Sequence, residues 1–118
     1  MNTYDIPPHI SGDTWNGISS ITFLRDGSAR NLSGAYVHMQ VRASIESPVV
    51  LDLSTTDNSI VIVNPPTSGI ITIPSRIVNI PVGNYIYDLK LITIDGEEKT
   101  SLKGNWNIIS HVTRWAIQ

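Results

Sequence analysis

The chain has 118 residues, of which 41% are hydrophobic and 15% are charged. This length and composition predict one globular domain with its own hydrophobic core, and they argue against intrinsic disorder. The formal net charge is −2 and the eight Lys and Arg residues are spread along the chain, so the sequence offers no basic surface for nucleic acid. Cysteine is absent, which excludes disulfides, thiol chemistry and cysteine-ligated zinc.

The sequence also lacks the signals that would direct it to or through a membrane. The first residues show neither the basic region nor the apolar region of a secretory signal. No apolar run approaches the roughly 18 residues that a membrane-spanning helix needs. We therefore expect a soluble protein that does not insert into a membrane.

Alternation of apolar and polar residues, which is typical of β-strands, dominates the chain. The N-terminal lead, residues 1–10, contains Pro7-Pro8 and is expected to form an extended edge segment. A first regular strand is expected over residues 18–25, closed by the turn Asp26-Gly27. In the strand that follows, over residues 35–43, every second side chain should face the core: Ala35, Val37, Met39 and Val41.

The second half predicts shorter strands and then a long hairpin. Strands are expected over residues 49–53, 60–63 and 69–73, and a short helical turn over residues 75–80, with Ser75 as its N-cap. Strands over 84–94 and 100–111 should pair around the tip Asp95-Gly96-Glu97-Glu98. The interior row of this hairpin is predicted to hold Tyr85, Tyr87, Leu89 and Leu91 with Leu102, Gly104, Trp106 and Ile108, and the solvent row Asp88, Lys90, Lys103, Asn105 and Asn107.

Together these elements predict an all-β fold: an immunoglobulin-like antiparallel β-sandwich of seven to eight strands, with turns about every 8 to 12 residues. The single domain spans residues 1–118 and ends in a C-terminal tail, 112–118. Gly83 followed by Tyr85, at the start of a late strand, is similar to the tyrosine corner of immunoglobulin-like domains, so Tyr85 should bond back to a nearby turn. Tyr87 would take the position of the second core cysteine of antibody domains. The predicted structural residues are Gly83, Tyr85, Tyr87 and Trp106.

Residues that could carry chemistry do not form a recognisable site. His9, His38 and His111 are far apart and lack the spacing of metal ligands. Asp88 and Asp95 fit salt-pair and turn roles better than acid–base catalysis. Phosphate-binding loops, dinucleotide-binding motifs, nucleophile elbows and zinc-protease helices are absent from the sequence. We therefore predict a protein that is not an enzyme and uses no metal or other cofactor.

Aromatic residues are the best candidates for partner contacts, because interfaces and sugar sites both use them. Trp15 lies in a glycine-rich early loop and is expected to be exposed, as is Tyr36. Trp115, in the tail, is either a docking arm or folds back onto the sandwich, and the sequence leaves both open. The complete set of candidate contact residues is Tyr4, Trp15, Tyr36, Arg114 and Trp115.

Several stretches, read together from about Gly12 to Arg114, resemble a family of small tailed-phage virion proteins with an immunoglobulin-like domain. They are "DG" at Asp26-Gly27, "NLSGAYVHMQVRAS" at 31–44, "VVLDLST", "SGIITI", "IPVGNYIYDLKL" at 80–91 and "DGEEKTSLKGNWNIISHVTR" at 95–114. A looser similarity is to the N-terminal domain of phage baseplate upper proteins. The motif positions kept are Leu32, Gly34, Ala35, Val41, Arg42, Gly83, Tyr85, Tyr87, Asp88, Leu89, Gly104, Thr113 and Arg114, whereas Asn31 stands where an acidic residue is common.

The resemblance implies a non-catalytic structural protein of the virion, made in the host cytoplasm. It would be a small adaptor or decoration module in the tail, baseplate, neck or capsid, present in multiple symmetric copies and contacting other phage structural proteins through an edge strand or its termini. The alternative is a carbohydrate-binding module that helps attachment to a host glycan, motivated by Trp15, Tyr36 and the Asn-rich loops. A small hydrolase is the third and least favoured interpretation.

Overall fold

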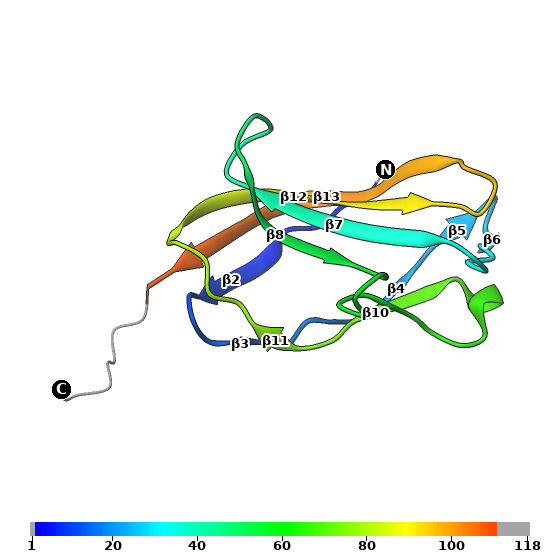
Figure 1. Ribbon diagram of the computed structural model, residues 1–118, viewed down its shortest axis with the longest axis horizontal. Helices are drawn as coiled ribbons and strands as arrows, with labels where there is room; N and C mark the ends of the chain where they lie inside the picture. Colours follow the sequence, from blue (N-terminus) through cyan, green and yellow to red (C-terminus); the bar gives the residue numbers. More distant parts are fainter. Residues whose placement is uncertain (1, 111–118) are drawn as a thin grey trace.

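Strands make up most of residues 2–110, which are the part of the chain that the computed structural model describes (Figure 1). The strands are β1 (Asn2–Thr3), β2 (Ile6–Ile10), β3 (Thr14–Trp15), β4 (Ile18–Thr22), β5 (Leu24–Arg25), β6 (Ser28–Ala29), β7 (Tyr36–Arg42), β8 (Val49–Ser54), β9 (Val61–Ile62), β10 (Ile70–Ile73), β11 (Arg76–Ile77), β12 (Gly83–Ile92) and β13 (Glu98–Ile109). A 3-10 turn, Pro66–Ser68, precedes β10. The expected all-β fold is confirmed.

The larger sheet has six strands in the order β1-β13-β12-β7-β8, with β2 also paired to β13. Its centre is antiparallel, and the β12–β13 pair forms the long hairpin expected from the sequence. The N-terminal lead is extended and lies at the edge, as expected, but β1 and β2 run parallel to β13. A purely antiparallel sandwich is therefore wrong at this edge, because the lead runs along the last strand in the same direction.

The second layer consists of shorter strands that lie below the large sheet in the view of Figure 1. The order β4-β10-β9 forms a three-stranded sheet, and the pairs β3–β11 and β5–β6 flank it. Side chains from the two layers meet to form one core, which gives the molecule its sandwich-like shape, about 53 Å in its longest dimension.

The alternation predicted for the large sheet is confirmed by burial. On β7, Val37, Met39 and Val41 are buried and the intervening side chains are half-exposed. On β12 and β13 the buried side chains are Tyr85, Tyr87, Leu89, Leu91, Trp106 and Ile108, with Leu102 and Gly104 partly buried. A register shift after Leu89 changes the partner of the next residue, Lys90, to Thr100. Such a bulge adds local twist without moving the apolar row out of the core.

Two local predictions about turns are also confirmed. Arg25 pairs with Ser28, and the two residues between them, Asp26 and Gly27, have φ angles of 53° and 82°. Two consecutive positive φ values are the requirement of a type I′ hairpin turn, for which Asp-Gly is a preferred sequence. The Tyr85 hydroxyl donates to the main-chain carbonyl of Pro81 at 2.6 Å, which is the backward bond expected of this residue.

The helical turn expected over residues 75–80 is wrong. Arg76 and Ile77 form β11, which pairs with β3, and the main-chain N–H of Gly12 donates to the carbonyl of Val78 at 2.9 Å. Val78 and Ile80 are buried in the core. Tertiary hydrogen bonds and apolar burial therefore override the local N-cap signal, since helix propensity is worth only tenths of a kcal/mol per residue.

The sheet edges carry features that hinder strand addition. On β8 a register shift places Val50 in a bulge between the pairs Val41–Leu51 and Arg42–Val49. The opposite edge strand, β2, contains two prolines, which lack N–H donors. In the smaller sheet β4 is bulged opposite Thr72, and β9 has only two residues. Bulges, prolines and short strands are the means by which natural sheets avoid edge-to-edge pairing.

Candidate binding groove on the outer face of the large sheet

The outer face of the large sheet carries a regular array of side chains, all of them polar except Ile86. The register sets them in rows across β7, β12 and β13: Arg42, Ile86 and Asn105; Gln40, Asp88 and Lys103; His38, Lys90 and Thr100. Neighbouring strands lie about 4.8 Å apart, and successive rows about 7 Å apart along a strand. The array is therefore a grid of hydrogen-bonding and charged groups on a rigid sheet.

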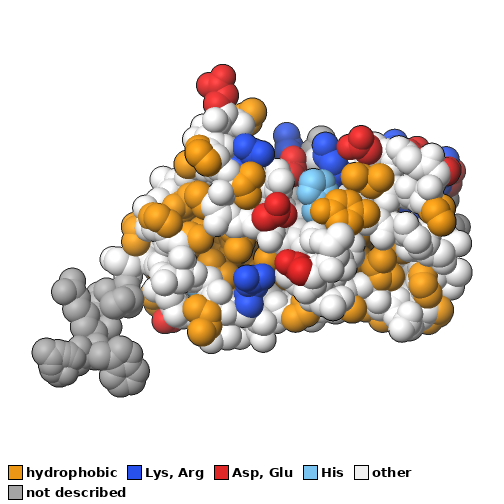
Figure 2. All heavy atoms as spheres, in the orientation of Figure 1, with side chains coloured by type: hydrophobic (Ala, Val, Ile, Leu, Met, Phe, Trp, Pro, Cys, Tyr) orange, Lys and Arg blue, Asp and Glu red, His pale blue; other side chains and the backbone are white. Residues whose placement is uncertain are grey.

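This face is hollowed into a shallow groove of about 600 Å³. Its lining comprises Thr3, His38, Gln40, Arg42, Ile45, Ile86, Tyr87, Asp88, Lys90, Lys103, Gly104 and Asn105. Charged side chains of both signs gather along the upper edge of the molecule in Figure 2, above the large sheet. The lining includes three cations, Arg42, Lys90 and Lys103, against one carboxylate, Asp88, whereas the chain as a whole has a net charge of −2.

The loop between β7 and β8 closes one end of the groove and projects from the body of the molecule (Figure 1). Internal hydrogen bonds hold it: the hydroxyl oxygens of Ser44 and Ser47 are 2.7 Å apart, and the Ser47 N–H donates to the Ser44 carbonyl at 3.1 Å. Arg42 donates to the Ser47 carbonyl at 2.8 Å and to Oε1 of Gln40 at 3.1 Å. The Arg42 guanidinium is therefore fixed in place, with further N–H donors remaining.

Two stacked aromatic rings lie at the end of the groove formed by His38. The ring centroids of Tyr36 and His38 are 5.2 Å apart with an interplanar angle of 29°. Both side chains are half-exposed and belong to the outward row of β7. Tyr36, which was expected to be exposed, is half-exposed, and it lies next to the groove residue His38 on the outward row of β7.

The structure overturns the expected exposure of Trp15. Its side chain is only 8% exposed, and its ring centroid lies 4.8 Å from that of Trp106. Pairing of β3 with β11 fixes the loop so that the indole points into the core. Burial of a large apolar surface outweighs the flexibility that the neighbouring glycines suggested. Trp15 is therefore a core residue and is removed from the candidate contacts.

The other predicted residues fall into three groups. Tyr4 is 45% exposed beside β13, where its N–H donates to the Lys103 carbonyl at 2.8 Å. Arg114 and Trp115 lie outside the described residues. The predicted structural residues Tyr85, Tyr87 and Trp106 are buried, and Gly83 begins β12, where an added Cβ would meet the Tyr85 ring at an ordinary 3.6 Å.

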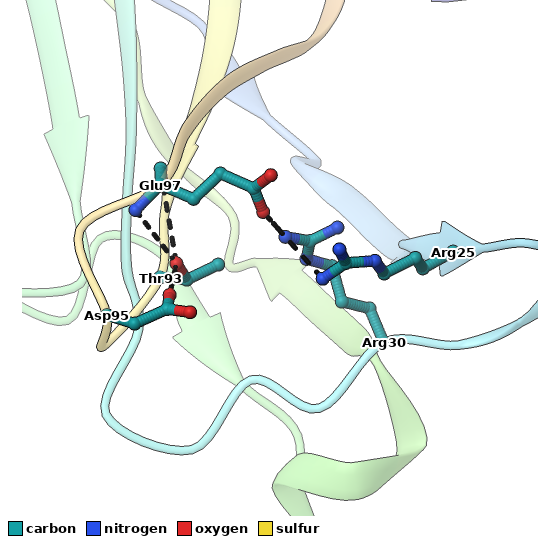
Figure 3. A network of polar contacts seen from close by, with 5 residues as sticks. All are labelled: Arg25, Arg30, Thr93, Asp95 and Glu97. Carbon is teal, nitrogen blue, oxygen red and sulfur yellow. Dashed lines mark hydrogen bonds and ion pairs between the residues drawn. The ribbon is translucent and has the colours of Figure 1, made fainter.

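A second polar cluster links the region of the β5–β6 hairpin to the turn between β12 and β13 (Figure 3). Glu97 accepts from Arg30, whose side chain is 11% exposed, and its Oε1 lies 3.9 Å from Nη1 of the more exposed Arg25. Thr93 donates to Asp95, and this bond lowers the pKa of the Asp95 carboxyl from its ordinary value. Asp57 also has a lowered pKa, chiefly because the Ser59 hydroxyl donates to it. Lowered pKa values in turns are typical of structural carboxylates and not of general acids.

Over residues 2–110, His, Asp and Glu side chains do not gather in groups of three that could hold a metal ion. In the same range, helices with the length and apolar character required to span a bilayer are absent. Comparison of the chain with protein-family models, with curated proteins and with solved structures finds no match.

The sequence predicted the outward position of the groove residues Asp88, Lys90, Lys103 and Asn105, but these were interpreted as ordinary solvent-facing side chains. Alternation reports which face of a sheet a residue occupies and says nothing of whether that face is flat or hollow. Ile45 was missed entirely because it lies in a loop without periodicity. The excess of basic residues on alternate positions of β7, β12 and β13 is the one signal from which the groove's charge could have been found.

Proposed function

We propose that this protein is a non-catalytic structural component of a tailed-phage particle, a small adaptor or decoration module that contacts other virion proteins. The resemblance of its sequence over residues 12–114 supports this assignment, and so does a surface poor in charge. In such a particle the protein would be present in several symmetric copies.

We also propose that the sandwich is immunoglobulin-like. The strand orders support this: β13-β12-β7-β8 corresponds to strands G, F, C and C′ of a variable-type domain, and β4-β10-β9 to strands B, E and D. The bond from Tyr85 to the Pro81 carbonyl has the form of a tyrosine corner at the start of strand F. The core tryptophan differs from the usual pattern, because Trp106 lies on the strand equivalent to G.

The contact is proposed to use the projecting loop instead of an edge strand. Bulges on β8 and β4 and prolines on β2 disfavour addition of a partner strand to these edges. The sequence had favoured an edge strand or the termini, so the loop between β7 and β8 is a revised choice of interface.

The observation that carries the proposal is the position of Ile45. Its side chain is 84% exposed, the highest value among the large hydrophobic residues described, and it stands on a loop held by hydrogen bonds. An ordered loop loses little conformational entropy on binding, and burying an isoleucine contributes about 1.5–3 kcal/mol. Ile45 has the properties of a preformed interface anchor.

The test uses particles produced from the genome that encodes this chain, with the gene supplied in trans. Quantitative mass spectrometry of purified particles should detect the wild-type protein in a repeated copy number. Ile45→Asp should reduce its copies per particle at least about tenfold, because the carboxylate would be buried without a partner. Ile77→Asp is the matched control: Ile77 is 65% exposed but lies on β11, away from the loop.

Normal incorporation of the Ile77→Asp variant beside loss of the Ile45→Asp variant is the expected result. Absence of the wild-type chain from the particles would overturn the virion assignment. Equal incorporation of both variants would retain the virion assignment and overturn the role of the loop.

A further inference from the structure

We propose that the groove on the outer face of the large sheet binds an acidic polysaccharide, a chain of sugar units that carry carboxylates. This proposal goes beyond assembly of a particle and does not depend on it. It rests on the charge of the groove, on the types of side chain that line it and on the aromatic pair at its end.

Charge complementarity is the first argument. Arg42, Lys90 and Lys103 line the groove against the single carboxylate of Asp88, in a chain that is acidic overall. Lys90 is partly engaged, with its Nζ at 3.9 Å from Glu98 Oε1, whereas the Arg42 guanidinium is held ready by two hydrogen bonds. A concentration of positive charge on a hollowed surface attracts anionic ligands and raises their rate of association.

The chemistry of the lining is the second argument. Sugar hydroxyls both donate and accept, and the groove presents amides on Gln40 and Asn105 as well as the Asp88 carboxylate. The Tyr36–His38 pair, with centroids 5.2 Å apart, offers a flat aromatic face against which a sugar ring can pack. A small number of placed polar groups beside an aromatic surface is the usual composition of a small-ligand site.

An acidic peptide fits the groove less well. Peptides bind sheet proteins by adding a strand to an edge or by inserting apolar anchors into pockets. The groove lies on a sheet face where the main-chain groups are already paired in the β7–β12–β13 ladder. Its apolar side chains on the outer face are those of Ile45 and Ile86, so it lacks a deep apolar pocket for an anchor. The geometry therefore favours a saccharide.

The experiment measures binding of a galacturonic acid hexasaccharide to the whole chain by isothermal titration calorimetry, with maltohexaose and an oligo-glutamate as comparison ligands. Saturable binding of the acidic hexasaccharide is expected, weakening as salt is added, because exposed charges are screened. Lys103→Gln should weaken it at least about tenfold, the loss of one charge-assisted hydrogen bond. Tyr36→Ala should weaken binding of the hexasaccharide more than binding of the oligo-glutamate, since only the sugar packs on the Tyr36 ring.

Lys99→Gln is the matched control. It removes the same charge from the same strand, but Lys99 pairs with the inward-facing Leu91 and does not line the groove. Its affinity should equal that of the wild type, and circular dichroism of both variants should match the wild-type spectrum. The proposal is overturned if the acidic hexasaccharide does not bind, if Lys99→Gln loses as much affinity as Lys103→Gln, or if oligo-glutamate or maltohexaose binds as tightly. None of these results bears on whether the chain is found in virions.

Discussion

The hydroxyl of Tyr87, on β12, donates a hydrogen bond to the main-chain carbonyl of Tyr4, 83 positions earlier in the chain. The same carbonyl passes directly over Gly104 of β13, where an added Cβ would lie 2.0 Å from the oxygen. The Tyr87 hydroxyl and the lack of a Cβ at Gly104 therefore hold the N-terminal lead against β13. The lead forms one border of the outer-face groove through Thr3.

Replacing Tyr87 with Phe should lower the free energy of unfolding by about 1–2 kcal/mol, because the Tyr4 carbonyl loses its donor while the ring stays in place. Urea unfolding measures the change. Hydrogen exchange at the Tyr4 amide, which donates to Lys103, should also become faster as the lead loosens. Unchanged exchange at this amide would contradict the proposed role of the hydroxyl.

The same residue predicts a dependence on alkaline pH. Burial, and then the nearby charges of Tyr4 and Asp5, raise the pKa of the Tyr87 phenol well above its ordinary value of 10.0. A folded-state pKa above the unfolded one contributes stability that is present below about pH 10 and is lost as the pH rises further. The wild-type urea midpoint should therefore fall more steeply than that of Tyr87→Phe above pH 10. Parallel curves for the two proteins would count against a buried phenol.

Gly104→Ala should destabilise the fold and displace the lead from β13, because the new methyl group would overlap the Tyr4 carbonyl. Overpacking of this kind costs about 1–3 kcal/mol. Gly83→Ala is the matched control in the same hairpin, since its Cβ would meet the Tyr85 ring at 3.6 Å. The control should unfold within about 0.5 kcal/mol of the wild type. Equal losses of stability in both variants would show that any Gly→Ala change in this hairpin is destabilising, and that the contact of Gly104 with the Tyr4 carbonyl is not the cause.

Trp15→Ala should cost about 3–5 kcal/mol, the usual effect of removing a large buried aromatic side chain. The indole packs against Trp106, and its loss leaves a cavity between the two layers. Thermal unfolding should show the loss clearly, whereas Tyr36→Ala, at a half-exposed position, should change stability far less. If Trp15→Ala left the stability almost unchanged, Trp15 would be exposed, as the sequence had suggested.

The contrast between Trp15 and Trp106 shows what the sequence could and could not predict. Trp106 was placed in the core because it belongs to an alternating row in a long hairpin, where the register assigns every side chain to a face. Trp15 lies among glycines without periodicity, so its burial is decided by the pairing of β3 with β11, which are 61 positions apart in the Arg76–Trp15 register. The parallel attachment of the lead to β13 depends on contacts of the same long-range kind.

The ion pair between Arg30 and Glu97 gives a final prediction, about how the segment after β6 is held to the turn between β12 and β13 (Figure 3). Glu97→Gln should lower the free energy of unfolding by about 1–3 kcal/mol, because the Arg30 guanidinium, 11% exposed, keeps its position but loses its counter-charge. Arg25→Gln is the control: its Nη1 is 3.9 Å from Glu97 and its side chain is 63% exposed, so its loss should cost under about 0.5 kcal/mol.

A double-mutant cycle with Arg30→Gln and Glu97→Gln separates the pair from its surroundings. The coupling should persist in 0.5 M salt, because a shielded pair is screened far less than one in open solvent. Coupling that vanishes with added salt would mean that Arg30 is as exposed in solution as Arg25.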